Sequence, residues 1–167
     1  MSRGPFDGTA APPTLRSALG RFATGVTIVT CYDADGESVG LTVNSFTALS
    51  LDPPLVLWAL RVESPSLASF ESAGRFAVNV LGEQQLELSR RFASTAPHKF
   101  AAGRWSAGRF GAPVLAGALA VFECATTSAQ RQGDHVVFVG EVLHSTAHAG
   151  PPLVFQSGRY RSLGEPL

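Results

Sequence analysis

The chain lacks an excess of charge of either sign. Its 167 residues contain 13 Lys plus Arg and 13 Asp plus Glu, so the formal net charge is +0. A nucleic-acid-binding protein needs a basic face that neutralises phosphates, so nucleic acid is not an expected partner. Charged residues make up only 16% of the chain and hydrophobic residues 45%. With so few charged side chains, part of the apolar surface is left exposed to water, which favours association between chains. We therefore expect a homo-oligomer, most simply a homodimer.

Cysteine is scarce, and long hydrophobic runs are missing. Cys31 and Cys124 are too few for a secreted disulfide framework and lack the C-x-x-C spacing of a metal or redox pair, so we expect both in the core. The longest apolar runs, such as residues 55–60, are too short to span a membrane, and the N-terminus has no apolar signal segment. These absences predict a soluble, cytoplasmic protein with no membrane partner.

Several catalytic motifs are also missing. No G-x-G-x-x-G follows a predicted strand, which argues against a Rossmann dinucleotide site, and no G-x-S-x-G elbow indicates a hydrolase. His144 and His148 have the spacing of metal ligands on a helix, but they lie where a strand or its exit is expected. We therefore predict no metal site.

The pattern of apolar residues and turns predicts one domain at residues 14–164. Residues 1–13 are mostly Gly, Pro and small residues, which bury too little apolar surface to offset the entropy of ordering, so we expect a flexible arm. We expect helices at 14–25, 64–74 and 83–92, the first with Leu15, Leu19 and Phe22 as its apolar face. We expect strands at 26–32, from 38 onward, at 55–60, at 76–81, on both sides of the turn 132–135, and within 151–160. The strand at 55–60 is apolar throughout and is expected to be buried on both sides. Many short strands and few helices predict a mainly β, α+β barrel.

The stretch from Gly40 to Pro54 alternates small polar side chains with apolar ones and ends in a turn. Its neutral hydrogen-bonding side chains are Thr42, Asn44, Ser45, Thr47 and Ser50. Backbone N–H groups of the turn can receive an anion, so the stretch suits a flat ligand with an anionic tail. The alternative is an edge strand whose polar face meets water.

Seven segments, in order, carry a resemblance to a known family. They are Gly25–Thr30, Gly40–Phe46, Ser50–Pro54, Arg75–Leu81, Lys99-Phe100, Gly133-Asp134-His135 and Gly158-Arg159-Tyr160. In these segments the chain resembles the short-chain flavin reductases of two-component flavin-dependent monooxygenases. The resemblance implies an FMN-binding-type split β-barrel that binds flavin at a dimer interface, with residues from both subunits.

The resemblance also implies the ligands and the site residues. FAD or FMN and NADH, or alternatively NADPH, are the expected ligands. The expected cofactor-binding residues are Thr30, Thr42, Asn44, Ser45, Phe46, Thr47, Ser50, Leu51, Lys99, Phe100, His135, Arg159 and Tyr160. His135 is also the expected catalytic residue, placed beside the nicotinamide; without the resemblance it reads equally as a solvated turn histidine next to Asp134.

The expected reaction is hydride transfer from NADH to FAD or FMN, after which the reduced flavin leaves for a separate monooxygenase. Such an enzyme needs few reactive side chains, because the two ring systems carry the chemistry. Two alternatives remain open. The same barrel can hold flavin tightly and act as an oxidase or electron carrier, or it can be a non-enzymatic cofactor-binding module.

Overall fold

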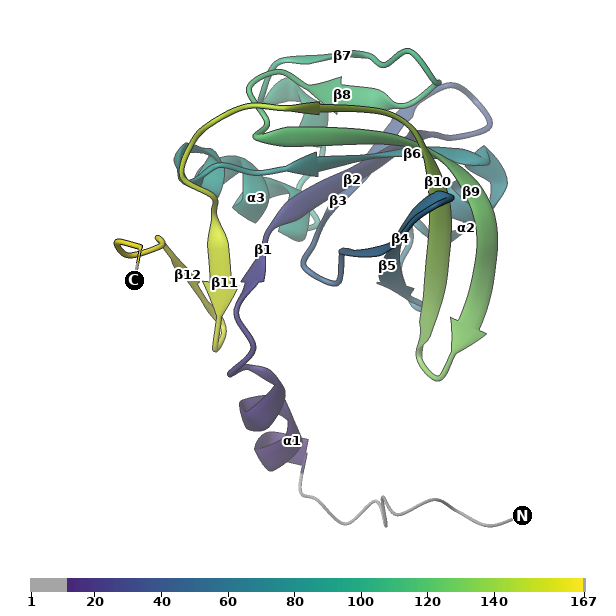
Figure 1. Ribbon diagram of the computed structural model, residues 1–167. Helices are drawn as coiled ribbons and strands as arrows, with labels where there is room; N and C mark the ends of the chain where they lie inside the picture. The colour runs from purple at the N-terminus through teal and green to yellow at the C-terminus, as the bar shows by residue number, and fades with distance from the viewer. Residues whose placement is uncertain (1–11, 167) are drawn as a thin grey trace, which may run out of the picture.

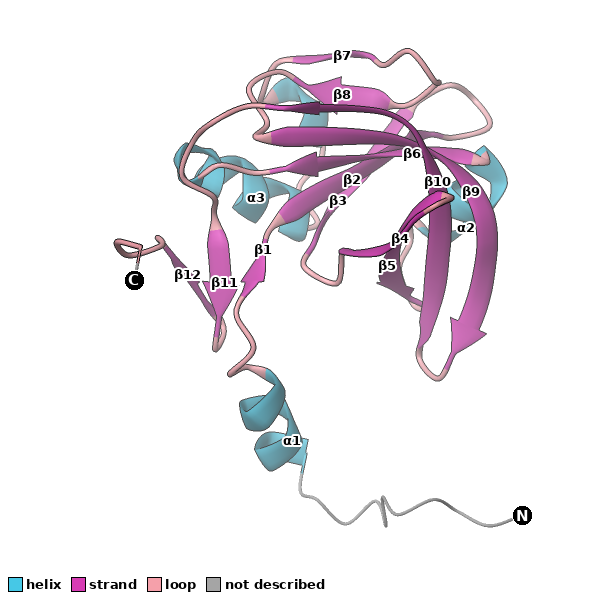
Figure 2. Cartoon of the chain, viewed as in Figure 1, coloured by secondary structure: helices cyan, strands magenta, loops and turns pink. Residues whose placement is uncertain are grey.

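A computed structural model describes residues 12–166 of the chain, in which strands dominate and the helices are short and peripheral (Figure 2). The strands are β1 (Thr24–Gly25), β2 (Thr27–Tyr32), β3 (Ser38–Val43), β4 (Thr47–Leu51), β5 (Pro54–Arg61), β6 (Arg75–Val80), β7 (Trp105–Ala107), β8 (Pro113–Leu115), β9 (Ala120–Gln132), β10 (His135–Ala147), β11 (Val154–Gln156) and β12 (Arg159–Arg161). The helices are α1 (Pro12–Leu19), α2 (Leu67–Ala73) and α3 (Leu86–Ala93), and the short 3-10 helices are η1 (Glu83–Gln85) and η2 (Lys99–Ala101). Most of the predicted arm, residues 1–11, lies outside the described residues.

One antiparallel sheet curls into a barrel, with strand order β3-β2-β6-β9-β10-β5-β4 (Figure 1). Its two edge strands, β3 and β4, are consecutive in the chain, so residues 44–46 pass from one edge of the sheet to the other. The Ser45 hydroxyl accepts a hydrogen bond from the Ala59 N–H and donates one to the Ala59 carbonyl, both at 3.0 Å. Ser45 therefore closes the barrel by satisfying backbone groups of β5 beyond the end of its pairing with β4.

Large aromatic side chains fill the barrel. Trp58 is fully buried, stacks on Phe138 at a centroid distance of 4.7 Å, and meets Phe70 edge-on at 4.9 Å. A second cluster around Phe92 packs α3 against the other end of the sheet. The helix at 67–73 lies within its predicted range, and Gly74 ends it at φ 64°. The helix at 86–93 begins three residues later and ends one residue later than predicted.

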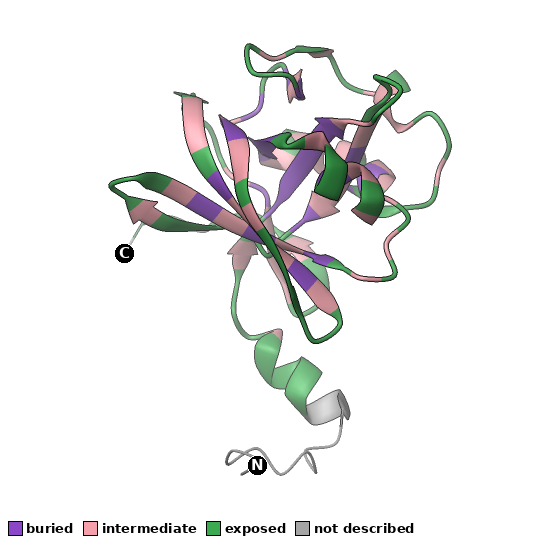
Figure 3. Ribbon diagram, turned by 90° about the vertical axis from the view of Figure 1, so that its right-hand side faces the viewer, coloured by how far each residue is buried: buried purple, intermediate pink, exposed green. Residues whose placement is uncertain are grey.

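Within a single copy of the chain, residues 55–60 are not buried on both sides, in contrast to the prediction. Val56, Trp58 and Leu60 are buried, whereas Leu57 and Ala59 on the outer face are only half-buried. Such alternation between buried and less buried residues is visible along the strands in Figure 3. The reason is that β5 belongs to an antiparallel barrel, in which one face of each strand lines the core and the other is open.

The N-terminal helix is shorter than predicted. It ends at Leu19, and Gly25, its predicted end, lies in β1, which pairs with β11. The predicted apolar face does not pack on the core, since Leu15, Leu19 and Phe22 are 52%, 67% and 77% exposed. Figure 1 shows α1 lying away from the barrel. Pairing of Thr24 and Gly25 with β11, in a separate sheet of order β1-β11-β12, overrides the local helical pattern.

Both cysteines lie in the core as predicted. Burial raises the pKa of each thiol, Cys31 and Cys124, to about 12, so both stay protonated at neutral pH. Because the thiolate is the reactive form, iodoacetamide at neutral pH should leave the native protein unlabelled and should modify both cysteines after denaturation. Mass spectrometry of the intact protein measures this, and fast labelling of the native chain would contradict the buried placement.

No helix within residues 12–166 is long and apolar enough to cross a membrane.

Candidate active site

A pocket of about 480 Å³ opens where the barrel closes. It is lined by residues of β3, of the segment that joins β3 to β4, of β5 and the turn after it, and of β10: Leu41, Thr42, Val43, Asn44, Ser45, Ala59, Leu60, Arg61, Glu63, Ser64 and His135. The volume lies in the range of about 300–1,000 Å³ that is typical of small-molecule sites. The predicted residues Thr42, Asn44, Ser45 and His135 are thus brought together.

Two of the predicted polar side chains hold the pocket in shape. Thr42 donates from Oγ1 to the Ser89 carbonyl at 2.7 Å and so ties β3 to α3. The Ser45 hydroxyl is bound to both backbone groups of Ala59. Asn44 is exposed between them, so its amide is available to a ligand. An amide offers both donors and acceptors, which matches the mixed hydrogen-bonding edge of a heterocycle.

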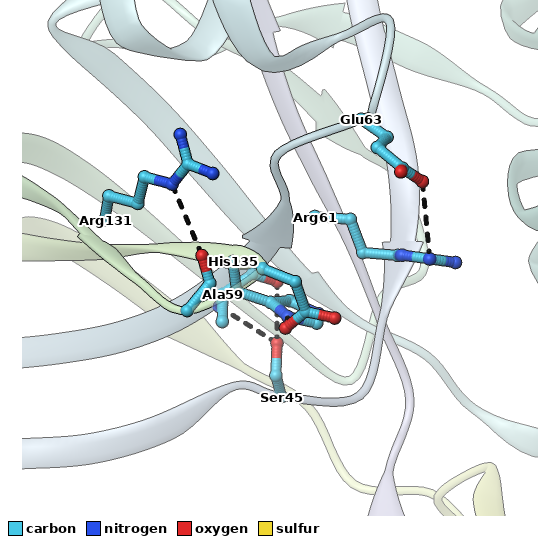
Figure 4. Close-up of polar contacts among 8 residues, drawn as sticks. Ser45, Ala59, Arg61, Glu63, Arg131 and His135 are labelled. Atoms are coloured by element: carbon cyan, nitrogen blue, oxygen red, sulfur yellow. Dashed lines mark hydrogen bonds and ion pairs between the residues drawn. The ribbon is translucent and has the colours of Figure 1, made fainter.

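His135 begins β10 at the tip of the long β9–β10 hairpin. Its Nδ1 lies 2.8 Å from Oδ1 of Asp134 (Figure 4). This hydrogen bond and the charge of the imidazolium hold the pKa of Asp134 below its usual value. Because the carboxylate occupies Nδ1, Nε2 is the ring nitrogen left to meet a ligand in the pocket.

Arg61 lies directly opposite His135 in the β5–β10 pair. Residues directly opposite in an antiparallel pair point to the same face, so both side chains reach the same side of the pocket. The Arg61 guanidinium is 3.5 Å from the Glu63 carboxylate (Figure 4). Nothing in the sequence distinguishes Arg61 from Arg104, Arg131, Arg159 and Arg161 as a residue able to meet a phosphate. Only the strand register shows that Arg61 lies opposite His135.

Three other predicted site residues make packing or hydrogen-bond contacts within the chain, and cofactor binding by Phe46 and Phe100 stays a prediction. Thr30 is fully buried, and its hydroxyl donates to the Pro113 carbonyl at 2.6 Å, so the structure does not bring Thr30 to the pocket. Phe46 packs on Phe122 with a centroid distance of 5.6 Å. Phe100 belongs to the aromatic cluster around Phe92, at 5.0 Å.

The remaining predicted residues lie outside the lining of the pocket in the same chain. Lys99 donates from Nζ to the Phe92 carbonyl at 3.2 Å, and burial lowers its pKa. The Tyr160 hydroxyl is 2.9 Å from Ser89 Oγ, which links the last strand to α3, and Arg159 is exposed beside it. Thr47, Ser50 and Leu51 lie on β4, at the sheet edge, and the turn that follows them is not part of this pocket.

Comparison with known proteins identifies the class. The model of the flavin reductase like domain matches residues 19–164, so the chain belongs to the flavin reductase-like domain family. This confirms the family and the split-barrel fold predicted from the sequence motifs.

Three similar proteins show how far the likeness extends. A probable flavin reductase of Rhizobium meliloti (strain 1021) is 49% identical over 131 residues, 78% of this chain, and the chain spans 42% of that relative's length. The reductase subunit HsaB of a flavin-dependent monooxygenase from Rhodococcus jostii (strain RHA1) is 43% identical over 169 residues, covering 98% of this chain and 86% of HsaB. The structure of the NADH:FAD oxidoreductase SgcE6 of Streptomyces globisporus C-1027, in complex with NAD and FAD fragments, has a TM-score of 0.86 and 37% identity, and the match covers 98% of this chain and 97% of SgcE6.

Proposed function

We propose that this chain transfers hydride from NADH to FAD or FMN and releases the reduced flavin to a separate monooxygenase. The membership of residues 19–164 in the flavin reductase-like family carries this proposal. HsaB supports the monooxygenase partner, since it is the reductase subunit of such an enzyme, and SgcE6 supports NADH as the hydride donor. A cytoplasmic location is also part of this proposal, because two cysteines are too few for the disulfide framework of a small secreted domain.

The residues of the pocket fit a flat, largely neutral ring system. Leu41 and Ala59 supply partly exposed apolar surface, and the exposed amide of Asn44 supplies hydrogen bonds to a ring edge. When bound, the nicotinamide supplies the hydride and the flavin ring takes it. The chain's contribution is to hold the two rings at a contact distance of about 3–3.5 Å. Thr42 and Ser45 serve that purpose by fixing the segment that carries Asn44.

We infer that His135 positions the nicotinamide amide, with Asp134 orienting the imidazole through Nδ1. His135→Ala should therefore raise the apparent KM for NADH about tenfold and leave the KM for flavin within about twofold, since a lost hydrogen bond to a ligand typically costs about that factor. Steady-state kinetics with each substrate varied in turn measures this. The exposed His148 serves as a matched control, and His148→Ala should change neither constant. Equal rises in both KM values for His135→Ala would exclude the assignment.

We propose that the chain works as a homodimer whose second copy covers the outer face of the sheet. That face carries Leu57 and Ala59 on β5 and, directly opposite them, Val139 and Val137 on β10. An open sheet face is normally polar, so an apolar one indicates a covering partner. Arg61 and His135 continue the same face, which would place the pocket at the edge of the interface.

The experiment that tests the function is the loss of NADH absorbance in air, with and without added FAD or FMN. Consumption that requires added flavin and saturates with it supports a reductase that releases its product. A yellow protein that consumes NADH without added flavin would instead indicate a tightly bound flavin. No consumption with either flavin and either NADH or NADPH would contradict the proposed function.

A further inference from the structure

The C-terminal hairpin of β11 and β12 is joined to two other parts of the chain. β11 pairs with Thr24 and Gly25 of β1, and Tyr160 of β12 reaches α3. Figure 1 shows the hairpin beside β1, on the side of the barrel that carries α3. Tyr160 is not among the described residues that line the pocket. Within one copy of the chain, its influence on the pocket therefore has to pass through other residues.

Three contacts fix the side chain of Tyr160. Its ring meets the ring of Phe155 edge-on, with a centroid distance of 5.3 Å. The guanidinium carbon of Arg90 lies over the ring, 5.9 Å from its centroid, which is within the range of a cation–π contact. The hydroxyl is 2.9 Å from Ser89 Oγ. Because both the ring and the hydroxyl are engaged, Tyr160 holds α3 in one place relative to the hairpin.

Ser89 of α3 connects Tyr160 to the pocket. Ser89 is fully buried, so its side chain does not reach a ligand itself. Its hydroxyl meets Tyr160, whereas its backbone carbonyl accepts the hydrogen bond from Thr42 Oγ1 at 2.7 Å. Thr42 lines the pocket two residues before Asn44. Two hydrogen bonds therefore run in series from the hairpin to the segment that carries Asn44.

The packing of α3 on β3 is close enough to transmit a displacement. Gly40 of β3 lies against Phe92 of α3, since a Cβ atom at Gly40 would be only 2.9 Å from Phe92 Cε1. Protein interiors at this density have little free space to absorb the shift of a helix. A change in the place where Tyr160 holds α3 is thus passed on to β3.

We propose that Tyr160 is a positioning residue for flavin binding, which acts through Ser89 and Thr42 on Asn44. The inference rests on the proposed function, in which Asn44 binds the edge of the flavin ring. It differs from the expectation that Tyr160 contacts the nicotinamide nucleotide directly. Loss of the Tyr160 hydroxyl would leave the Ser89 hydroxyl buried without that partner, which is unfavourable and favours a shift of α3.

The kinetic test removes the hydroxyl and keeps the ring. Tyr160→Phe should raise the apparent KM for flavin about fivefold, the usual effect of one lost hydrogen bond, and should change the KM for NADH less than about twofold. Ser89→Ala removes the same bond at a fully buried residue and should reproduce this rise. The matched control is Tyr32→Phe, at the other tyrosine of the chain, which ends β2 and should alter neither constant. A rise in the KM for NADH, or a rise in the KM for flavin with Tyr160→Phe alone, would overturn the inference.

A double-mutant cycle tests whether the effect passes through Thr42. Thr42→Val removes the second hydrogen bond of the series. In the Thr42→Val background, Tyr160→Phe should raise the KM for flavin less than about twofold further, because residues that act through one another are not additive. Full additivity of the two substitutions would contradict the series.

Hydrogen exchange separates this inference from the proposed function, because it requires no oxidation of NADH. Mass spectrometry should find faster amide exchange at residues 40–46 in Tyr160→Phe and Ser89→Ala, with unchanged exchange in β6 at the centre of the sheet. Tyr32→Phe should exchange like the wild type at residues 40–46. Unchanged exchange there in Tyr160→Phe would overturn the inference. Absence of flavin-dependent NADH oxidation in the wild type, with the exchange rates shifted as expected, would count against the proposed function alone.

Discussion

If the chain forms the proposed homodimer, Leu57→Glu is expected to convert it to a monomer and to reduce the proposed flavin reductase activity at least about tenfold. Leu57 is half-buried at the centre of the apolar outer face of β5 and lies opposite Val139 of β10. A carboxylate there meets water in the monomer, but in a dimer it would be buried without a partner, which is strongly unfavourable. Light scattering coupled to size exclusion gives the mass, and the NADH assay gives the activity.

The control for this variant is a leucine that is exposed but distant from the sheet face. Leu163 is 62% exposed in the C-terminal tail, and Leu163→Glu should leave both mass and activity unchanged. Circular dichroism should show that Leu57→Glu retains its strands, since the inner face of β5 is untouched. A Leu57→Glu protein that stays dimeric and active would show that this face is not the interface.

Trp58→Ala is expected to destabilise the folded chain by about 3–5 kcal/mol, the usual cost of removing a large buried aromatic side chain. Trp58 is fully buried and contacts Phe138, Phe70 and Phe76, with centroid distances of 4.7, 4.9 and 5.8 Å. Total stabilities of domains are about 5–15 kcal/mol, so the variant should lose a large fraction of its folded stability. Urea unfolding followed by circular dichroism measures the change.

A conservative replacement distinguishes packing from hydrogen bonding at this position. Trp58 Nε1 is buried, and within residues 12–166 it has no hydrogen-bond partner. Trp58→Phe therefore removes part of the ring volume and no hydrogen bond, and should cost much less than Trp58→Ala. Similar losses for the two variants would show that the stacked cluster does not carry the stability assigned to it.

Some features could be predicted because their signals are local. The sequence Asp33-Ala34-Asp35-Gly36 predicts a hairpin turn, and Gly36 adopts φ 82° there, between β2 and β3. The segment Gly133-Asp134-His135 likewise places a histidine at a hairpin tip beside a carboxylate, and the two side chains are hydrogen-bonded. Turn formation and contacts between adjacent residues depend on a few neighbouring residues, so they can be predicted from the sequence.

Other features depend on which strands pair with each other, and for these the local sequence pattern gave a wrong prediction or none. The run of residues 55–60 is apolar at every position, so periodicity cannot show that only alternate residues face the core. The N-terminal pattern favoured a helix as far as Gly25, but Gly25 lies in β1 and pairs with Val154 of β11. Thr30 carries a small hydroxyl like Thr42 and Ser45, which line the pocket, yet it lies inside the barrel.

The sequence alone was sufficient for the family, the mainly β fold and the position of His135, because ordered motifs and turn residues act over short distances. The tertiary structure decided that Arg61 faces His135 and that Ser45 closes the barrel on Ala59. These contacts join residues far apart in the chain. Their physical basis is the register of antiparallel strands and the closure of the sheet, which depend on the packing of the whole core and leave no short pattern in the sequence.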